Sequence, residues 1–231
     1  MSNAHSKAIV YGMPNSDLKT VEINGQEITV HKEVVKPLTQ LLGQLDNDGL
    51  TTNVVSHWRS FDHQCSIWTA KWQGKRTLLD RNECPLQTEA LSNEQKFDAL
   101  CFWSAIPGLS RHHWGTDFDI FLAKPMAEGY QPQLIPSEFS SEGPAASLEV
   151  WLDKHLTDYA FYRPYQDGFS GVSPEPWHIS YYPVATEMLK KVEATEVASL
   201  IKHSKLPEKN FIVERLERYI ADYVEKVAPL P

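Results

Sequence analysis

Two short segments of the chain combine histidines with carboxylates in a pattern that can bind a metal ion. In the segment Ala105 to Ile120, His112 follows a Pro-Gly turn and Asp119 comes seven positions later. We expect His112 in a short loop and Asp119 in the strand after Gly115, because glycine favours a break between them. Zinc accepts imidazole nitrogens and carboxylate oxygens at roughly 2.0–2.2 Å. A loop that doubles back can therefore bring both side chains to one ion.

The second segment places a carboxylate three residues before a histidine. Pro174 and Pro176 flank Glu175 and restrict the backbone to an extended or turn form, and His178 follows at the start of an expected strand. Zinc lowers the pKa of a bound water to about 7, so a glutamate beside an imidazole ligand can take its proton. The alternative for this segment taken alone is a surface turn with a packed Trp177.

Together the two segments supply the ligands of an open zinc site. His112, Asp119 and His178 match the three protein ligands of a hydrolytic zinc enzyme, which leaves a fourth position for water. Two neighbours keep alternatives open, because His113 is adjacent to His112 and Asp117 shares a strand face with Asp119. One member of each pair can bind the ion while the other orients it by a hydrogen bond.

Local patterns predict the elements that must position these residues. Alternating residues around Asn24-Gly25 predict a hairpin within residues 21–30. Strands are expected at 51–58, 116–122 and 178–182, and helices at 34–45, 61–72, 92–103, 145–159, 185–192, 195–203 and 210–227. Ser92 and Gln95 form an expected capping box. This mixture favours an α+β fold, a single domain with a mainly antiparallel sheet and flanking helices.

Composition limits the classes of function. A chain of 231 residues that is 42% hydrophobic fits one domain with a sizeable core. The net charge of −8 argues against nucleic-acid binding, which needs clustered Lys and Arg. Cys65, Cys84 and Cys101 form no CxxC pair, which disfavours a zinc ribbon or a disulfide framework, and we interpret them as small buried hydrophobes.

The sequence also bears on location. The N-terminal stretch has no basic region followed by an apolar region, and no apolar run approaches the length of a membrane span. The chain as written is therefore expected to be cytoplasmic, and a periplasmic or envelope location would require a removed leader.

Taken together, the motifs resemble the D-Ala-D-Ala carboxypeptidase family of zinc peptidases. This group includes lysostaphin, vancomycin-resistance D,D-peptidases, phage endolysins and hedgehog domains. The family pattern S-x-H-x-x-G-x-x-x-D is filled by Ser110, His112, Gly115 and Asp119. E-P-W-H follows at 175–178, and W-R-S-F-D-H-Q at 58–64 matches the family's Arg-Ser-x-x-x-Gln element. The resemblance spans about residues 54–182, with the motifs in family order.

This resemblance implies roles for the residues of the reaction centre. His112, Asp119 and His178 would bind zinc. Glu175 would act as the general base and then as the general acid. Arg59 would stabilise the oxyanion that develops on the scissile carbonyl, as a fixed cation in a dry site can.

The resemblance also implies how the substrate is held and how the chain is organised. Ser110 and Gln64 would hold the terminal carboxylate of the substrate or its nearby backbone. The implied fold is of the hedgehog and D,D-peptidase type, with one zinc peptidase domain over 1–231. Its core would cover about residues 50–185, and residues 185–231 would form a helical C-terminal extension.

The implied activity is that of a D-alanyl-D-alanine carboxypeptidase on peptidoglycan stem peptides, by Glu-assisted attack of zinc-bound water. Two alternatives keep the site, namely an L,D-carboxypeptidase and a cell-wall endopeptidase. A third is a zinc-stabilised binding module without turnover, although such a module has no need of both Glu175 and Arg59. The partner is a peptidoglycan-derived peptide, and the oligomeric state stays open.

Two positions depart from the family pattern. Asp117 stands where members often have Ala, and Ile179-Ser180-Tyr181-Tyr182 stands where many carry Arg and Tyr. Neither change removes a ligand or the base, so they bear on the pocket and the substrate rather than on the chemistry.

Overall fold

The computed structural model describes residues 8–231, and part of the N-terminal stretch considered for a leader lies outside them. The strands form a two-stranded hairpin and a four-stranded sheet in the order β3-β4-β6-β5. The strands are β1 (Leu18–Ile23), β2 (Gln26–His31), β3 (Thr52–Ser56), β4 (Asp117–Leu122), β5 (Phe161–Tyr162) and β6 (His178–Tyr181). All paired neighbours are antiparallel, which confirms the α+β class with a mainly antiparallel sheet.

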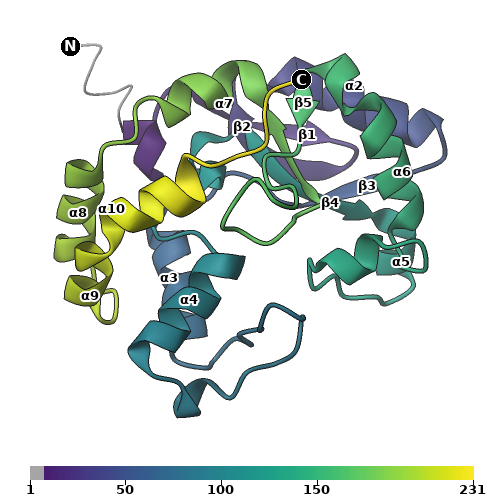
Figure 1. Ribbon diagram of the computed structural model, residues 1–231. Helices are drawn as coiled ribbons and strands as arrows, with labels where there is room; N and C mark the ends of the chain where they lie inside the picture. The colour runs from purple at the N-terminus through teal and green to yellow at the C-terminus, as the bar shows by residue number, and fades with distance from the viewer. Residues whose placement is uncertain (1–7) are drawn as a thin grey trace.

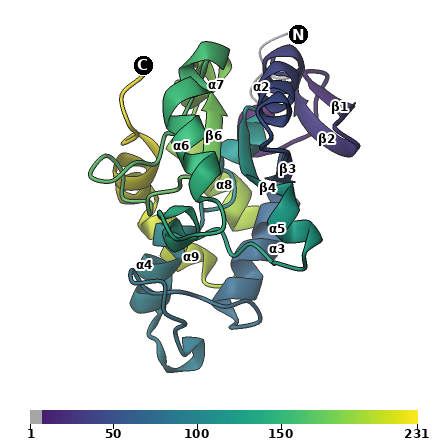
Figure 2. The same cartoon turned by 90° about the vertical axis from the view of Figure 1, so that its right-hand side faces the viewer.

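Helices surround the sheet on several sides. They are α2 (Val35–Asn47), α3 (Phe61–Trp72), α4 (Asn93–Trp103), α5 (Ala123–Ala127), α6 (Ala146–His155), α7 (Tyr182–Leu189), α8 (Ala194–His203), α9 (Lys209–Glu214) and α10 (Leu216–Tyr219). In Figure 1, α8, α9 and α10 gather on the left and α2 and α6 on the right. Both ribbon views place α3 and α4 below the sheet (Figures 1 and 2).

Two hydrophobic cores hold these layers together. The hairpin, α2, the sheet and α6 share one core, which contains Leu42 and Phe118. Helices α3, α4 and α7 to α10 share the other, which contains Trp68 and Trp114. The half-buried Tyr181 packs against both. The end of β6 thus joins the sheet core to the helical core.

The inner strands β4 and β6 bring two predicted ligands side by side. All six residues of β4 are buried, including Asp117 and Asp119. Asp119 lies directly opposite His178 in the antiparallel register. Residues paired in this way have Cβ atoms about 4.5–5.5 Å apart, so the pairing alone places a carboxylate beside an imidazole.

The sequence patterns predict most elements but not all. The hairpin and the capping box of Ser92 and Gln95 are confirmed. The single helix expected over 210–227 is wrong, because the chain breaks at Arg215 and continues through α10 into a π turn at Ile220–Val224. β5 was not predicted, since two residues are too short to show a period.

The burial expected for the cysteines holds only in part. Cys101 is buried, Cys65 is half-buried and Cys84 is exposed, and all are free thiols. Cys84 was therefore misread, because it lies in a tight turn where its backbone N–H bonds to the Asp80 carboxylate at 2.9 Å. Within residues 8–231, no helix has both the length and the apolar character that crossing a bilayer requires.

Candidate metal centre

A short 3₁₀ turn and a glycine carry the chain from the first predicted ligand to the second. His112 lies in the turn η3 (Arg111–Trp114), which ends at Gly115 with a φ of +68°. A Cβ at Gly115 would stand 2.7 Å from the backbone nitrogen of His31. Only glycine fits this left-handed position against the hairpin, and it lets the chain turn directly into β4.

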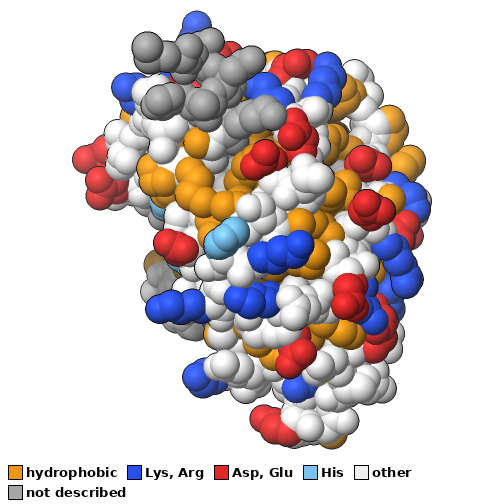
Figure 3. Space-filling view, turned by 90° about the vertical axis from the view of Figure 1, so that its left-hand side faces the viewer, with side chains coloured by type: hydrophobic (Ala, Val, Ile, Leu, Met, Phe, Trp, Pro, Cys, Tyr) orange, Lys and Arg blue, Asp and Glu red, His pale blue; other side chains and the backbone are white. Residues whose placement is uncertain are grey.

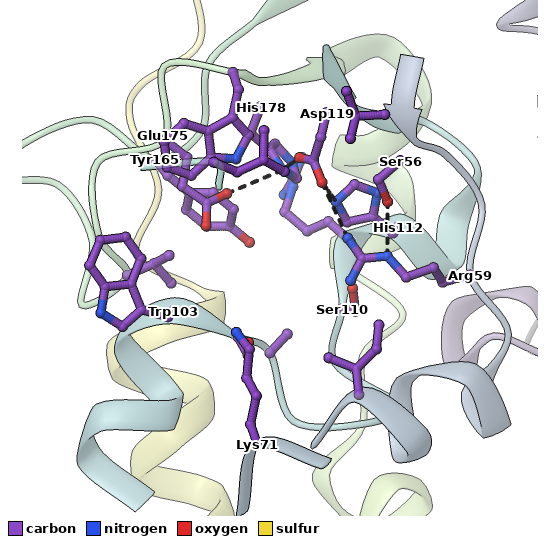
Figure 4. Close-up of a pocket in the computed structure, with 18 of the residues that line it drawn as sticks. Ser56, Arg59, Lys71, Trp103, Ser110, His112, Asp119, Tyr165, Glu175 and His178 are labelled. Atoms are coloured by element: carbon purple, nitrogen blue, oxygen red, sulfur yellow. Dashed lines mark hydrogen bonds and ion pairs between the residues drawn. The ribbon is translucent and has the colours of Figure 1, made fainter. Parts of the chain in front are cut away.

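The three predicted ligands converge within the fold. His112 Nε2 lies 3.3 Å from Asp119 Oδ2, and His178 Nδ1 lies 3.1 Å from Asp119 Oδ1. One ligand atom from each of the three residues lies within 4.8 Å of the others, and all three residues are buried. Two ligands on a tetrahedral zinc ion at roughly 2.0–2.1 Å are about 3.4 Å apart. The donor set and its spacing therefore fit zinc (Figure 4).

His112 is held in the neutral form that a ligand needs. Burial and the nearby Arg59 guanidinium lower the pKa of His112 to about 4. Within the described chain its Nδ1 atom is buried without a hydrogen-bond partner, while Nε2 faces Asp119. In the metal-free protein Nε2 is thus placed to donate to Asp119, and the tautomer with its hydrogen on Nδ1 would instead direct the Nε2 lone pair toward the other two ligands.

His178 is contacted by carboxylates on both ring nitrogens. Nδ1 lies 3.1 Å from Asp119 and 3.3 Å from Glu175, whereas Nε2 lies 3.0 Å from Asp117 Oδ1. Burial alone would lower the pKa of His178, but these three carboxylates raise it well above its ordinary value. The two aspartates therefore differ in position. Asp119 faces both His112 and His178, whereas Asp117 contacts the ring nitrogen of His178 that points away from this cluster.

A buried arginine anchors Asp117. Arg111 Nε donates to Asp117 Oδ1 at 2.7 Å, and Arg111 Nη2 donates to Ser180 Oγ at 2.7 Å. Thr116 Oγ1 donates to the other carboxylate oxygen of Asp117. Burial alone would raise the pKa of Asp117, but Arg111 and His178 hold it below its ordinary value. The two departures from the family pattern, Asp117 and Ser180, therefore meet at one arginine, which the sequence reasoning did not single out.

His113 contacts backbone atoms rather than the ligand cluster. The Gly108 N–H donates to His113 Nε2 at 3.0 Å, so Nδ1 carries the hydrogen and donates to the Arg59 carbonyl at 2.7 Å. Burial lowers the pKa of His113 to about 3, which keeps this tautomer neutral. The alternative that His113 is a ligand gains no support from this geometry.

Arg59 is fixed by three side chains. Nε donates to Ser56 Oγ at 3.0 Å, Nη1 donates to Gln64 Oε1 at 3.0 Å, and Nη2 lies 3.3 Å from Asp119 Oδ2. Arg59 precedes Ser60, the N-cap residue of α3, whose side chain accepts from the His63 N–H. The Arg-Ser-x-x-x-Gln element is thus a helix start that aims a guanidinium at the ligand cluster.

Glu175 is held at the edge of the cluster by its turn. Its backbone N–H donates to the Tyr165 carbonyl at 3.0 Å, and its own carbonyl accepts from the His178 N–H at 3.1 Å. Its side chain is 13% exposed and lies 3.3 Å from His178 Nδ1. Burial raises the pKa of Glu175, and His178 and Arg59 only partly offset this.

The two predicted substrate-binding residues occupy different places. Ser110 lines the cavity, although it is buried. Gln64 lies behind Arg59 and is not a lining residue. Its Oε1 accepts from Arg59 and its Nε2 donates to the Ala105 carbonyl at 2.8 Å. Both halves of the Gln64 amide are therefore already engaged.

The cluster opens onto a cleft of about 840 Å³. One side, the sheet wall, carries the ligand cluster with Arg59, Glu175 and Tyr165 (Figure 4). The facing side, the helical wall, is formed by the ends of α3 and α4 and the turn after α3, and it is defined by Lys71, Lys75, Arg76, Trp103 and Ser104. Tyr165 and the residues of the helical wall belong to no motif, so no sequence pattern pointed to them.

Comparison with known proteins decides the family. The family model for the VanY D-alanyl-D-alanine carboxypeptidase matches residues 27–184, more than half of the chain. The chain belongs to this family. It is 30% identical over 130 residues to an uncharacterised protein of Haemophilus influenzae, a match that covers 55% of this chain and 96% of the relative.

Three solved structures share the fold. VanYB in complex with D-alanine-D-alanine matches with a TM-score of 0.54 and 20% identity, over 84% of this chain and 94% of that one. A mutant of the vancomycin-resistance D,D-pentapeptidase VanY in complex with Zn(II) matches with a TM-score of 0.52 and 22% identity, over 93% of this chain and 99% of that one. The LD-carboxypeptidase LdcB matches with a TM-score of 0.51 and 20% identity, over 92% of this chain and 82% of that one. These matches confirm the D,D-peptidase type of fold.

Proposed function

We propose that the chain is a zinc-dependent carboxypeptidase that removes the terminal D-alanine from peptidoglycan stem peptides. The observation that carries this proposal is the convergence of His112, Asp119 and His178, with Glu175 at 3.3 Å from His178. The family is a peptidase family, and one solved relative is a complex with Zn(II) and another with D-alanine-D-alanine. Those relatives support the choice of metal and substrate class for this chain.

The chain would hold zinc through His112 Nε2, an oxygen of Asp119 and His178 Nδ1. When bound, the ion supplies Lewis acidity that polarises the scissile carbonyl and makes a water more acidic. Asp117 accepts the hydrogen on His178 Nε2, which directs the Nδ1 lone pair toward the ion. Arg111 in turn keeps Asp117 in place.

Glu175 moves the proton. Its carboxylate accepts a proton from the attacking water and then delivers it to the nitrogen of the leaving amine, so one water is consumed for each peptide bond cleaved. A base that does both steps needs a pKa nearer to neutral than an exposed glutamate has, and burial raises the pKa of Glu175 in that direction.

Arg59 stabilises charge on the substrate. Its guanidinium is held by Ser56 and Gln64, so it is fixed before the negative charge develops on the scissile carbonyl oxygen. We assign Gln64 to the positioning of Arg59, since its oxygen accepts from Arg59 and its nitrogen donates to Ala105. Ser110, which lines the cleft, is left to contact the terminal carboxylate or the nearby backbone of the substrate.

Product analysis on defined wall peptides tests the proposal. The zinc-loaded protein is incubated with a stem pentapeptide and with the corresponding tetrapeptide, and products are identified by mass spectrometry with and without a chelator. Chelator-sensitive release of one D-alanine from the pentapeptide is expected. Cleavage of the tetrapeptide alone would indicate an L,D-carboxypeptidase, and an internal cut an endopeptidase. Stoichiometric zinc without cleavage would indicate a binding module.

A further inference from the structure

The helical wall presents one face of α3 to the cleft. His63, Ile67 and Lys71 follow one another at four-residue spacing, so they share the face that lines the cavity. The other face carries Trp68 and Trp72 into the helical core. Lys71 lies in the last turn of the helix, and Figure 4 shows its side chain extending into the cavity toward the sheet wall.

The turn after α3 adds two more cations to this wall. Gly74 takes a left-handed φ of +69°, and the backbone N–H groups of Lys75 and Arg76 donate to the Ala70 carbonyl at 2.8 and 3.1 Å. This turn brings Lys75 and Arg76 to the lining of the same cavity, where both are exposed. Three cationic side chains thus stand together in a protein whose net charge is −8.

These three cations have no carboxylate partner within residues 8–231, whereas several cations near the C-terminal helices are paired. The face over the C-terminal helices mixes Lys and Arg with Asp and Glu (Figure 3). Pairs that include a residue of the C-terminal helical region, with N–O distances of 2.6–2.8 Å, are Lys190–Glu187, Arg215–Glu94 and Lys226–Asp222. The carboxylates that line the cleft are Asp119 and Glu175, and both are engaged on the sheet wall.

Lys71 retains the capacity to bind an anion. Its Nζ donates to Ser104 Oγ at 2.5 Å, which uses one of the three ammonium hydrogens. Burial, with Arg59 and Arg76 nearby, lowers the pKa of Lys71 to about 8. An ammonium held close to other cations gains most from an incoming negative charge.

We propose that Lys71, with Lys75 and Arg76, forms a subsite for a second carboxylate on the substrate, carried by the side chain of a residue that precedes the scissile bond. The inference rests on the proposed function, because it names the kind of peptide that the same site takes. A cleft of about 840 Å³ holds a ligand of drug-like size, which leaves room for residues beyond a terminal dipeptide. Arg59 and Ser110 stay with the reacting end of the peptide, and the helical wall takes the added charge.

Two peptides that differ by one carboxylate test this subsite. Acetylated Xaa-D-Ala-D-Ala is prepared with Xaa as lysine or as 2,6-diaminopimelate, which adds a carboxylate at the end of the same side chain. Values of kcat/KM are compared for the wild type, Lys71→Met, Lys71→Arg and the control Lys36→Met, whose lysine is exposed on α2 outside the cleft. The wild type is expected to prefer the diaminopimelate peptide by about tenfold or more, as a charge-assisted hydrogen bond gives.

The variants decide what Lys71 does. Lys71→Met should lower the preference several-fold, with Lys75 and Arg76 retaining the remainder, whereas Lys71→Arg and Lys36→Met should keep it. Ser104→Ala removes the internal partner of Lys71 but keeps the ammonium, so it should also keep the preference. A folded Lys71→Met protein with the wild-type preference, or a wild type that does not prefer the added carboxylate, would overturn the subsite.

Binding of both peptides to the Glu175→Gln protein, measured by calorimetry, separates this inference from the proposed function. Equal cleavage of both peptides by the wild type overturns the subsite alone. Lys71-dependent binding of the diaminopimelate peptide without hydrolysis by the wild type overturns the carboxypeptidase and keeps the subsite. If neither peptide binds or is cleaved, both proposals are wrong.

Discussion

The two walls of the cleft are built in opposite ways. On the sheet wall, polar side chains hold one another: His178 contacts three carboxylates, and Arg59 is held by Ser56, Gln64 and Asp119. On the helical wall, Lys71 has one hydroxyl partner. A reaction centre must be fixed before the substrate arrives, whereas a recognition surface gains affinity from groups still free to bind. The difference agrees with the two proposals, which assign chemistry to the sheet wall and substrate choice to the helical wall.

Removing a ligand should break the sheet wall most severely. In His178→Ala, the cluster keeps two of its three ligands, so we expect loss of bound zinc and a fall of peptidase activity to background. Elemental analysis and a peptide assay measure both. His203→Ala, which changes an exposed histidine on α8, should keep zinc and activity. A His178→Ala protein with full zinc and full activity would remove this residue from the metal site.

Removing the fixed cation should be the next largest effect. Arg59→Ala is expected to lower kcat by about 10²–10³-fold, the usual cost of losing one oxyanion donor, and to keep zinc. Steady-state kinetics on a pentapeptide separate kcat from KM. An unchanged kcat with a raised KM would instead make Arg59 a residue that binds the substrate and the transition state equally.

Zinc affinity should depend on pH through His178. The pKa of this residue is raised well above its ordinary value, so the metal-free protein carries a proton there at neutral pH, and zinc must displace it. Lower pH therefore weakens zinc binding, by about tenfold per pH unit over the range in which this proton is bound. Competition titrations with a chelating dye measure this slope. A flat profile would mean that no proton is displaced.

Replacing Asp117, which contacts the ligand His178, should have a smaller effect on zinc binding than replacing the ligand itself. Asp117→Asn keeps the shape of the side chain but removes the charge that faces His178 Nε2 and Arg111. Zinc affinity should fall by about 10–100-fold, as is usual when the group that accepts a hydrogen bond from the other ring nitrogen of a ligating histidine is replaced. Thermal unfolding of the metal-free variant controls for the unpaired Arg111. Unchanged affinity would show that Asp117 does not orient His178.

What the sequence could predict follows the same division. His112, Asp119, Glu175 and His178 stand in short segments where glycine or proline fixes the backbone, so residue type and spacing predicted how they would be placed. The register that sets Asp119 opposite His178 joins segments 59 residues apart, and no local pattern encodes it. The resemblance to the family supplied that link.

The parts that could not be predicted depend on packing between distant segments. Arg111 looks like any surface arginine in the sequence, and only the fold buries it against Asp117 and Ser180. Gln64 matched the family element, yet its role depends on Ala105, which takes the other half of its amide. The sequence pattern shows Lys71 only as a polar residue at the end of a helix. The fold places Ser104, which follows α4, beside it and so forms the helical wall.

The central claim is that a zinc ion held by the sheet wall works with Glu175 to release D-alanine. The most direct measurement compares the wild type with Glu175→Gln for zinc content and for release of D-alanine from a stem pentapeptide, in one preparation. We predict about one zinc per chain in both proteins and a rate lower by about 10²–10⁴-fold in the variant. A zinc-loaded wild type that releases no D-alanine, or a variant that is fully active, would contradict the account.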